Sequence, residues 1–143
     1  MKGTLRSFDP EWRELAICKI QEHTEQLCAL HGAHCEVTIL RGYPAVNNHE
    51  GAARFAIKTA QSLIGDAQDT DFEPKMWGED FAFYGQHIPA AFWMLGVRPH
   101  HQMSMPGLHN AQFTPDEQAL PIGAAMMAKS AIEWLSNPPV NHE

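Results

Sequence analysis

The chain has 143 residues, of which 44% are hydrophobic and 19% are charged, and its formal net charge is −7. A domain of about this length buries roughly 68–70% of its surface, and a disordered chain would be poorer in apolar residues. The acidic balance excludes a general nucleic-acid binder, because only ten Lys and Arg residues could neutralise phosphates. No apolar run approaches the roughly 20 residues that a membrane helix needs, so we expect no membrane partner.

The chain contains three cysteines, Cys18, Cys28 and Cys35, with no Cys-x-x-Cys spacing. An odd count without a framework favours a reducing compartment, and we interpret the three thiols as buried small hydrophobes. The first residues turn acidic before any apolar run of signal-peptide length appears. We therefore expect a cytoplasmic protein.

The first elements in chain order are a short strand and a long helix. The stretch GTLRSF, residues 3–8, alternates loosely and predicts the strand. Asp9 can cap the helix, Pro10 suits its first position, and Gly32 marks its end. The predicted buried stripe of this helix is Trp12, Leu15, Ala16, Ile20, Leu27 and Cys28.

A second strand and a second helix follow. HCEVTILRGY, residues 34–43, alternates with period two and predicts a half-buried strand, which Gly42 and Pro44 end. An apolar stripe then predicts a helix that stops at Gly65, and the acidic stretch 65–74 predicts a surface loop. The stripe consists of Ala53, Ala56, Ile57, Ala60 and Ile64.

The last third begins with a continuous apolar run, AAFWMLGV at residues 90–97, which predicts a strand covered on both faces. The aperiodic stretch 98–113 predicts a loop that is functional or disordered. Thr114 and Pro115 open a capping-box pattern that predicts the last helix, and Pro121 should restart that helix. Its predicted buried stripe is Leu120, Ala124, Met127, Ala131 and Leu135, and the tail 136–143 should fray. Alternating helices and strands indicate an α/β fold.

Several polar residues are candidates for chemistry, each beside a plainer alternative. His109 lies in the loop before the last helix, and on spacing alone a histidine bonded to backbone is the better interpretation. The pair His100 and His101 could bind metal but is more typical of a solvated loop. Glu79 and Asp80 fit the start of a helix, where carboxylates are stabilising. Arg6 could pair with a substrate carboxylate or form a surface ion pair.

Four stretches taken in order resemble one family. They are GTLRSFDPEWRE, RGYPAVNNHE, MWGEDFAFY and LHNAQFTPDEQALPIGA. Together they resemble the C-terminal part of the two-metal amidohydrolases of peptidase family M20, which include hippurate hydrolases, aminoacylases and indoleacetyl-amino-acid hydrolases. The resemblance covers nearly the whole chain, and several motifs in the right order are more specific than any one alone.

The resemblance implies a partial catalytic α/β domain preceded by half of a ferredoxin-like lid. Residues 1–47 would be the second, β-α-β half of the lid and dimerisation domain, and residues 48–143 would be the C-terminal portion of the catalytic domain. It implies that His109 is a ligand of zinc or manganese and that Arg6, Gly78, Glu79 and Asp80 contact the substrate. That substrate would be an N-acyl amino acid or a small peptide.

The His-x-Asp motif and the Glu-Glu pair that complete the family's metal site and supply its general base are both absent from this chain. We therefore assign no catalytic residue here, and expect a fragment that is inactive alone and need not bind metal itself. The alternative is a non-catalytic subunit that self-associates or complements a separate N-terminal chain. An unpaired edge in the half-lid predicts a homodimer through residues 1–47.

Overall fold

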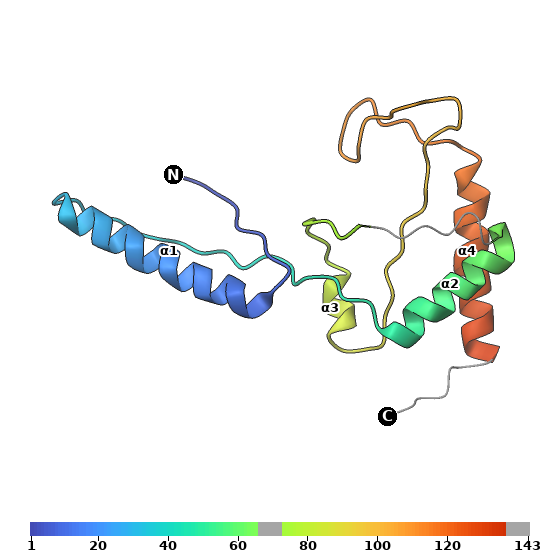
Figure 1. Ribbon diagram of the computed structural model, residues 1–143, viewed down its shortest axis with the longest axis horizontal. Coiled ribbons are helices and arrows are strands. Elements are labelled where there is room, and N and C mark those ends of the chain that lie inside the picture. The colour runs from blue at the N-terminus through green and yellow to red at the C-terminus, as the bar shows by residue number, and fades with distance from the viewer. Residues whose placement is uncertain (66–72, 137–143) are drawn as a thin grey trace. The chain divides into compact units, whose positions relative to one another are not determined.

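The computed structural model of the chain describes residues 1–65 and 73–136 and divides the chain into two compact units. The first unit is Met1–Asn47 with Phe72–Ile88, and the second is Asn48–Asp71 with Pro89–Glu143. The first unit holds helices α1 (Pro10–Leu30) and α3 (Ala82–Gly85), and the second holds α2 (Glu50–Ile64) and α4 (Ala119–Ser136) (Figure 1). Most of the predicted acidic loop and fraying tail, residues 66–72 and 137–143, lies outside the described residues.

The predicted α/β fold is wrong, because the described residues form helices and no strand. Each segment expected to be a strand, at 3–8, 34–43 and 90–97, runs without a strand ladder. A period-two pattern assigns side chains to faces, but a strand also needs a neighbour that takes up its N–H and C=O groups. Neither the β-α-β half-lid nor an α/β portion is therefore seen, and extended segments join the helices instead.

Helix α1 begins as the sequence predicts. The Asp9 carboxylate accepts hydrogen bonds from the backbone N–H of Glu11 (2.8 Å) and of Trp12 (3.0 Å), and Pro10 occupies the first position. The predicted end is also confirmed, because the helix stops at Leu30 and Gly32 adopts a left-handed φ of 63°. Capping is a short-range interaction, so it can be predicted from neighbouring residues alone.

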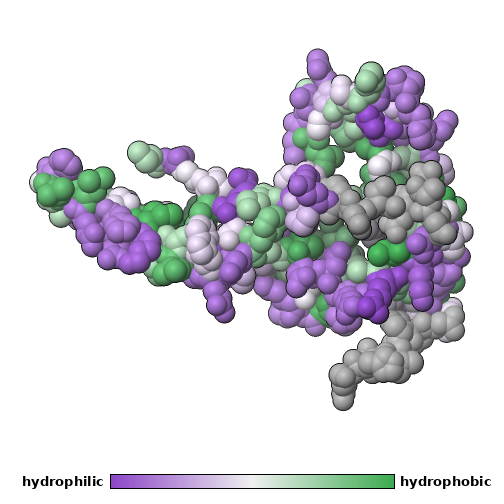
Figure 2. All heavy atoms as spheres, in the orientation of Figure 1, coloured by the Kyte–Doolittle hydropathy of each residue, from purple (hydrophilic) through white to green (hydrophobic). Residues whose placement is uncertain are grey.

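The predicted buried face of α1 is exposed. The chain returns along the helix through residues 33–43, and the contact between Arg41 and Glu14 (2.7 Å) fixes this segment beside it (Figure 1). Ile17 is the buried side chain of the helix, whereas Trp12 and Leu15 are 52% and 58% exposed. Hydrophobic side chains therefore remain on the surface of α1 (Figure 2).

In the second unit, α2 packs against α4. The Phe55 and Trp134 rings meet edge to face with centroids 5.1 Å apart. Thr59 is fully buried, and its hydroxyl donates to the Glu133 carboxylate at 3.1 Å. The predicted end of α2 at Gly65 is confirmed by the helix bounds and by a φ of 84° there.

Helix α4 begins later than the capping pattern predicts. It starts at Ala119, so that Pro121 falls in the first turn, where a backbone N–H has no partner to lose. Ala119 and Met126 are buried, whereas the predicted stripe is open to solvent, with Met127 63% and Leu135 81% exposed. Helix α4 thus carries apolar side chains on both a packed and an open face, as buried helices of larger cores do.

No helix within the described residues is both long and apolar enough to cross a membrane.

Candidate functional site

Three of the four family-like stretches meet at Tyr43 in the first unit. The Arg13 guanidinium donates to the Tyr43 carbonyl oxygen at 3.0 Å, which joins the first stretch to the second. The Tyr43 ring packs edge to face on Phe83, with centroids 6.0 Å apart, and a Cβ added at Gly78 would lie 3.3 Å from Cδ2 of Tyr43. Gly78 thus lies where Tyr43 leaves little room for a side chain. Tyr43 belongs to the Tyr-Pro pattern of RGYPAVNNHE that resembles the family, but its contacts with the other two stretches were not predicted.

The segment after Gly78 leads into α3. The Glu79 carboxylate accepts a hydrogen bond from the Phe81 N–H (3.2 Å), and the Asp80 carbonyl accepts one from Phe83 N–H (3.0 Å). This bond lies before α3, whose N-cap residue Phe81 has no side-chain capping hydrogen bond, so the predicted helix cap by Glu79 is not seen. Glu79 is partly buried and Asp80 is exposed. The substrate-contacting role of Gly78, Glu79 and Asp80 stays a prediction.

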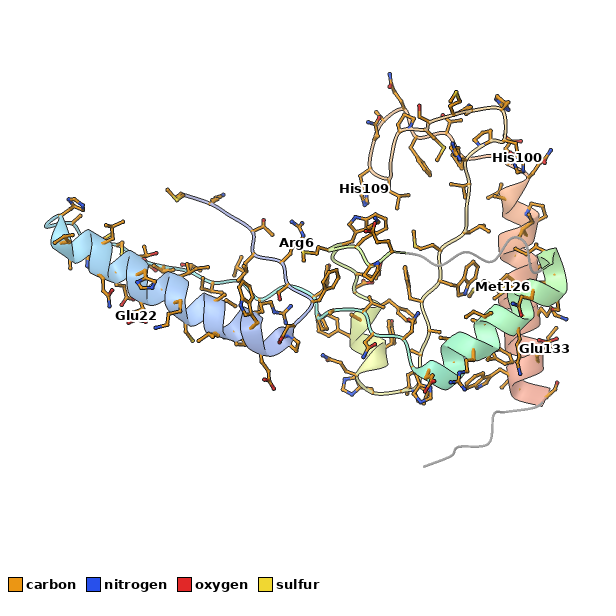
Figure 3. The ribbon with its side chains drawn as sticks, viewed as in Figure 1. Arg6, Glu22, His100, His109, Met126 and Glu133 are labelled. Carbon is orange, nitrogen blue, oxygen red and sulfur yellow. The ribbon has the colours of Figure 1, made fainter. Side chains whose placement is uncertain are left out.

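Arg6 lies on the extended segment before α1, and its side chain is exposed (Figure 3). Within residues 1–65 and 73–136 it forms no hydrogen bond or ion pair, so the surface ion pair considered for it is not seen there. An uncommitted guanidinium is suited to a carboxylate, with which it can form two parallel hydrogen bonds. Its role towards substrate stays a prediction.

His109 lies at the third position of a tight turn, where the Gly107 carbonyl accepts from the Asn110 N–H (3.3 Å). Its φ is 66°, and no other described residue besides glycine has a positive φ. Since Leu108 keeps an ordinary φ, this is the type II pattern, which normally places glycine at the third position. The imidazole is exposed (Figure 3). A non-glycine residue held in this conformation points to a constraint on where its side chain is directed.

The loop that carries His109 is organised by Arg98, a residue that no sequence motif marks. The Arg98 guanidinium donates to the carbonyl oxygens of Gln102 (3.1 Å) and Met103 (2.5 Å). At the base of the loop, the Asp116 N–H donates to the Val97 carbonyl at 2.8 Å. The long aperiodic stretch is therefore a loop held in place by these hydrogen bonds and not a structureless segment.

The Asn48 side chain forms hydrogen bonds with the backbone of the apolar run 90–97, as a neighbouring strand would. Its side-chain oxygen accepts from the Phe92 N–H (2.7 Å), and its side-chain nitrogen donates to the Phe92 carbonyl (2.9 Å). The neighbouring His49 N–H donates to the Ala90 carbonyl at 2.9 Å. One carboxamide thus makes two of the bonds expected of a neighbouring strand, which joins RGYPAVNNHE to the run. The run is only half-buried, with Met94 41% exposed, so the predicted two-sided cover is absent from the second unit as described.

The described residues do not fit a complete metal centre. Within residues 1–65 and 73–136 no three His, Cys, Asp or Glu side chains lie close enough together to hold a metal ion. His100 and His101 are both exposed. His109 belongs to the second unit, whereas Arg6 and Gly78 belong to the first. Neither unit therefore contains all three residues. A two-metal site needs several ligands and a general base, which these residues do not supply.

The open face of α1 forms a shallow groove in the first unit. Three polar side chains, those of Lys19, His23 and Thr24, line it together with apolar ones. The groove is lined by Leu5, Trp12, Leu15, Ala16, Lys19, Ile20, His23 and Thr24. Apolar patches of this kind, rimmed by polar residues, mark surfaces that another element or chain covers.

Residues 5–133 match the model of the peptidase family M20/M25/M40. "Putative amidohydrolase YhaA" of Bacillus subtilis is 36% identical over 132 residues, covering 92% of this chain and 33% of its own length. "IAA-amino acid hydrolase ILR1-like 6" of Arabidopsis thaliana is 32% identical over 139 residues, covering 94% of this chain and 30% of its own length. "Thermostable carboxypeptidase 1" of Saccharolobus solfataricus is 28% identical over 135 residues, covering 94% and 34%.

The chain therefore spans about a third of the length of each of these relatives. No solved structure matches it.

Proposed function

The chain belongs to peptidase family M20/M25/M40, and we propose that it forms the C-terminal part of a hydrolase that cleaves N-acyl amino acids or small peptides. The proposal is supported by relatives named as an amidohydrolase, an IAA-amino acid hydrolase and a carboxypeptidase. Residues 1–47 would belong to the lid, and residues 48–143 to the catalytic domain. We also propose a cytoplasmic location, on the basis of three cysteines without a disulfide framework.

The observation that carries this proposal is the left-handed turn at His109. The turn holds an exposed imidazole at the end of a loop that Arg98 braces through two backbone carbonyls. An imidazole is a common ligand for zinc and manganese. In the complete protein, His109 would contribute one ligand to such a metal, while Arg6 would hold a carboxylate of the substrate.

We propose that the chain is inactive on its own. Members of this family generally depend on metal ions, and the described residues offer one candidate ligand where a working site needs several. The remaining ligands and the general base would come from a region that corresponds to the part of the relatives not matched by these residues. No step of the reaction is assigned to residues of this chain beyond binding and positioning.

A chimera tests the proposal. The matching third of YhaA would be replaced by this chain, and hydrolysis of an N-acyl amino acid would be measured for the chimera and for the chain alone. We expect turnover from the chimera only, and loss of at least about tenfold in turnover when Arg6→Ala is introduced. The matched control is Arg54→Ala on α2, because Arg54 pairs with Glu50 on the same helix and should leave turnover unchanged. Turnover by the chain alone would contradict the proposal.

The second candidate is a non-catalytic subunit, which the open apolar face of α1 favours. Such a face would be covered by a second copy through residues 1–47 or by a separate N-terminal chain. Light scattering at micromolar concentration tests the first arrangement, with a dimer expected for the parent chain and a monomer for Leu15→Glu. If both proteins are monomers, a separate N-terminal chain is the remaining candidate partner.

A further inference from the structure

Two of the three thiols are neighbours at the end of α1. Cys28 lies on the last turns of the helix, one turn beyond Thr24 on the same face. Cys35 lies on the returning segment, and its thiol donates to the Thr24 carbonyl oxygen at 3.7 Å. The Ala33 N–H donates to the Cys28 carbonyl at 2.8 Å, which turns the chain back over the helix. The turn therefore brings Cys35 to the part of α1 that carries Thr24 and Cys28.

Cys28 also affects the ionisation of the Cys35 thiol. The neighbouring Cys28 thiol raises the pKa of the Cys35 thiol above its ordinary value, and burial and the nearby Glu25 carboxylate raise it further. Both cysteines are only partly buried, so small molecules in solution can reach them. Cys18, the third thiol, is exposed and lies near the middle of α1, so the prediction that all three thiols are buried is wrong.

We propose that Cys28 and Cys35 form a reversible disulfide that ties the end of helix α1 to the segment that follows it. The pair is a modification site that acts on the first unit and is independent of the hydrolase assignment. In reducing compartments, disulfides are mostly transient and serve as redox sensors, which fits a pair that is reduced in its resting form. Oxidation would lock the return of the chain along α1, and reduction would release it.

The oxidant for the two thiols is glutathione disulfide. One protein thiolate attacks a sulfur of the glutathione disulfide, forms a mixed disulfide and releases one glutathione thiolate. The second protein thiol loses its proton and attacks the protein sulfur of that mixed disulfide, which releases the second glutathione. Two protein thiols thus lose two electrons and two protons, and one glutathione disulfide becomes two glutathione thiols.

Tryptic mapping tests the proposal directly. Cleavage after Lys19 and Arg41 places Cys28 and Cys35 in one peptide, while Cys18 falls in another. The full chain would be exposed to glutathione disulfide at about pH 8.5, where ordinary thiols ionise, and then alkylated and digested. We expect the peptide from residues 20–41 to lose both alkyl labels and to become two hydrogen atoms lighter. Reduction before alkylation should restore both labels.

Three variants make the result specific. Cys18→Ser should leave the loss of both labels in the 20–41 peptide unchanged, because Cys18 is not a partner. Cys28→Ser and Cys35→Ser should each leave the remaining cysteine glutathionylated, with no ring closed. The proposal is overturned if the parent chain keeps glutathione on Cys28 or Cys35, or if the oxidised peptide is joined to a second peptide. As a further readout, oxidation should slow amide hydrogen exchange at the end of α1.

Discussion

His109 is held in a left-handed backbone conformation that residues other than glycine seldom adopt. A left-handed non-glycine residue costs of order 1–3 kcal/mol, and β-branched residues tolerate it least. We therefore expect His109→Val to lower the free energy of unfolding by about 1–2 kcal/mol. His109→Gly should be at least as stable as the parent, because glycine adopts a positive φ without strain. Urea unfolding of the three proteins measures this, and equal stability for Val and Gly variants would show that the turn is not left-handed.

Ser130 on α4 is the one described side chain with a buried oxygen that lacks a hydrogen-bond partner. Leaving such a group unpaired is costly, and alanine is also the better helix former. Ser130→Ala should raise the free energy of unfolding by about 1 kcal/mol. The matched change Ser62→Ala removes a hydroxyl that does donate, to the Thr59 carbonyl at 2.7 Å, and should bring less gain or a loss. Thermal unfolding compares the two, and a destabilised Ser130→Ala would contradict this account.

Single residues also mark where prediction from sequence stops. Asp9 could be assigned as a cap because its partners are two and three residues away. Arg13 reaches Tyr43 across 30 positions and Asn48 reaches Phe92 across 44, and no local pattern encodes such pairs. The candidate site was therefore predicted as separate residues, and its organising contacts at Tyr43, Asn48 and Arg98 were not.

At the scale of elements, α1 depends on its cap. Asp9 satisfies two of the N–H groups that a helix leaves without partners at its start. Asp9→Ala should lower the free energy of unfolding by about 1 kcal/mol and reduce the helical circular-dichroism signal. Asp9→Asn keeps an acceptor oxygen and should lose much less. A parent-like Asp9→Ala variant would mean that α1 is stabilised entirely by its contacts with residues 33–43.

The contact between α2 and α4 should weaken in acid. The Lys129 ammonium, 2.7 Å from the Glu133 carboxylate, and the Thr59 hydroxyl lower the pKa of Glu133 below 4.5. The folded state thus binds this proton less readily than the unfolded state, so the stabilisation is present above about pH 4.5 and is lost as the pH falls below it. Glu133→Gln should flatten the pH dependence of the melting temperature in this acid range. An unchanged acid slope in that variant would contradict the assignment.

Apolar periodicity predicted three long helices correctly, but Ile57 and Ile64 of the predicted α2 stripe are 42% and 37% exposed, and the buried faces of α1 and α4 are misplaced. The predicted stripes of these two helices include Leu15 and Met127, which are 58% and 63% exposed. Periodicity detects a face that is suited to burial, and it does so whether or not the covering element is present in the chain. The strand predictions are wrong for the same reason. Residues 34–43 and 90–97 have alternating or apolar patterns but no neighbouring strand among the described residues.

At the scale of the whole molecule, these features have one explanation. Two helices present open apolar faces, and Asn48 stands in for a missing strand at Phe92. The chain also spans about a third of the length of relatives that match nearly all of it. Hydrophobic surface of this extent is costly in water, at about 25 cal/mol per Å². We therefore infer that the sequence is adapted to a larger fold that covers these faces and completes the site.

The most direct test is zinc titration by calorimetry into the metal-free chain and into the metal-free YhaA chimera, each with and without His109→Ala. We expect the chain alone to give only weak binding that is insensitive to His109→Ala, because its nine histidines bind zinc adventitiously. The chimera should bind zinc tightly, and His109→Ala should weaken that binding at least about tenfold. Tight binding by the chain alone that disappears in His109→Ala would show a complete site within this chain and contradict the account.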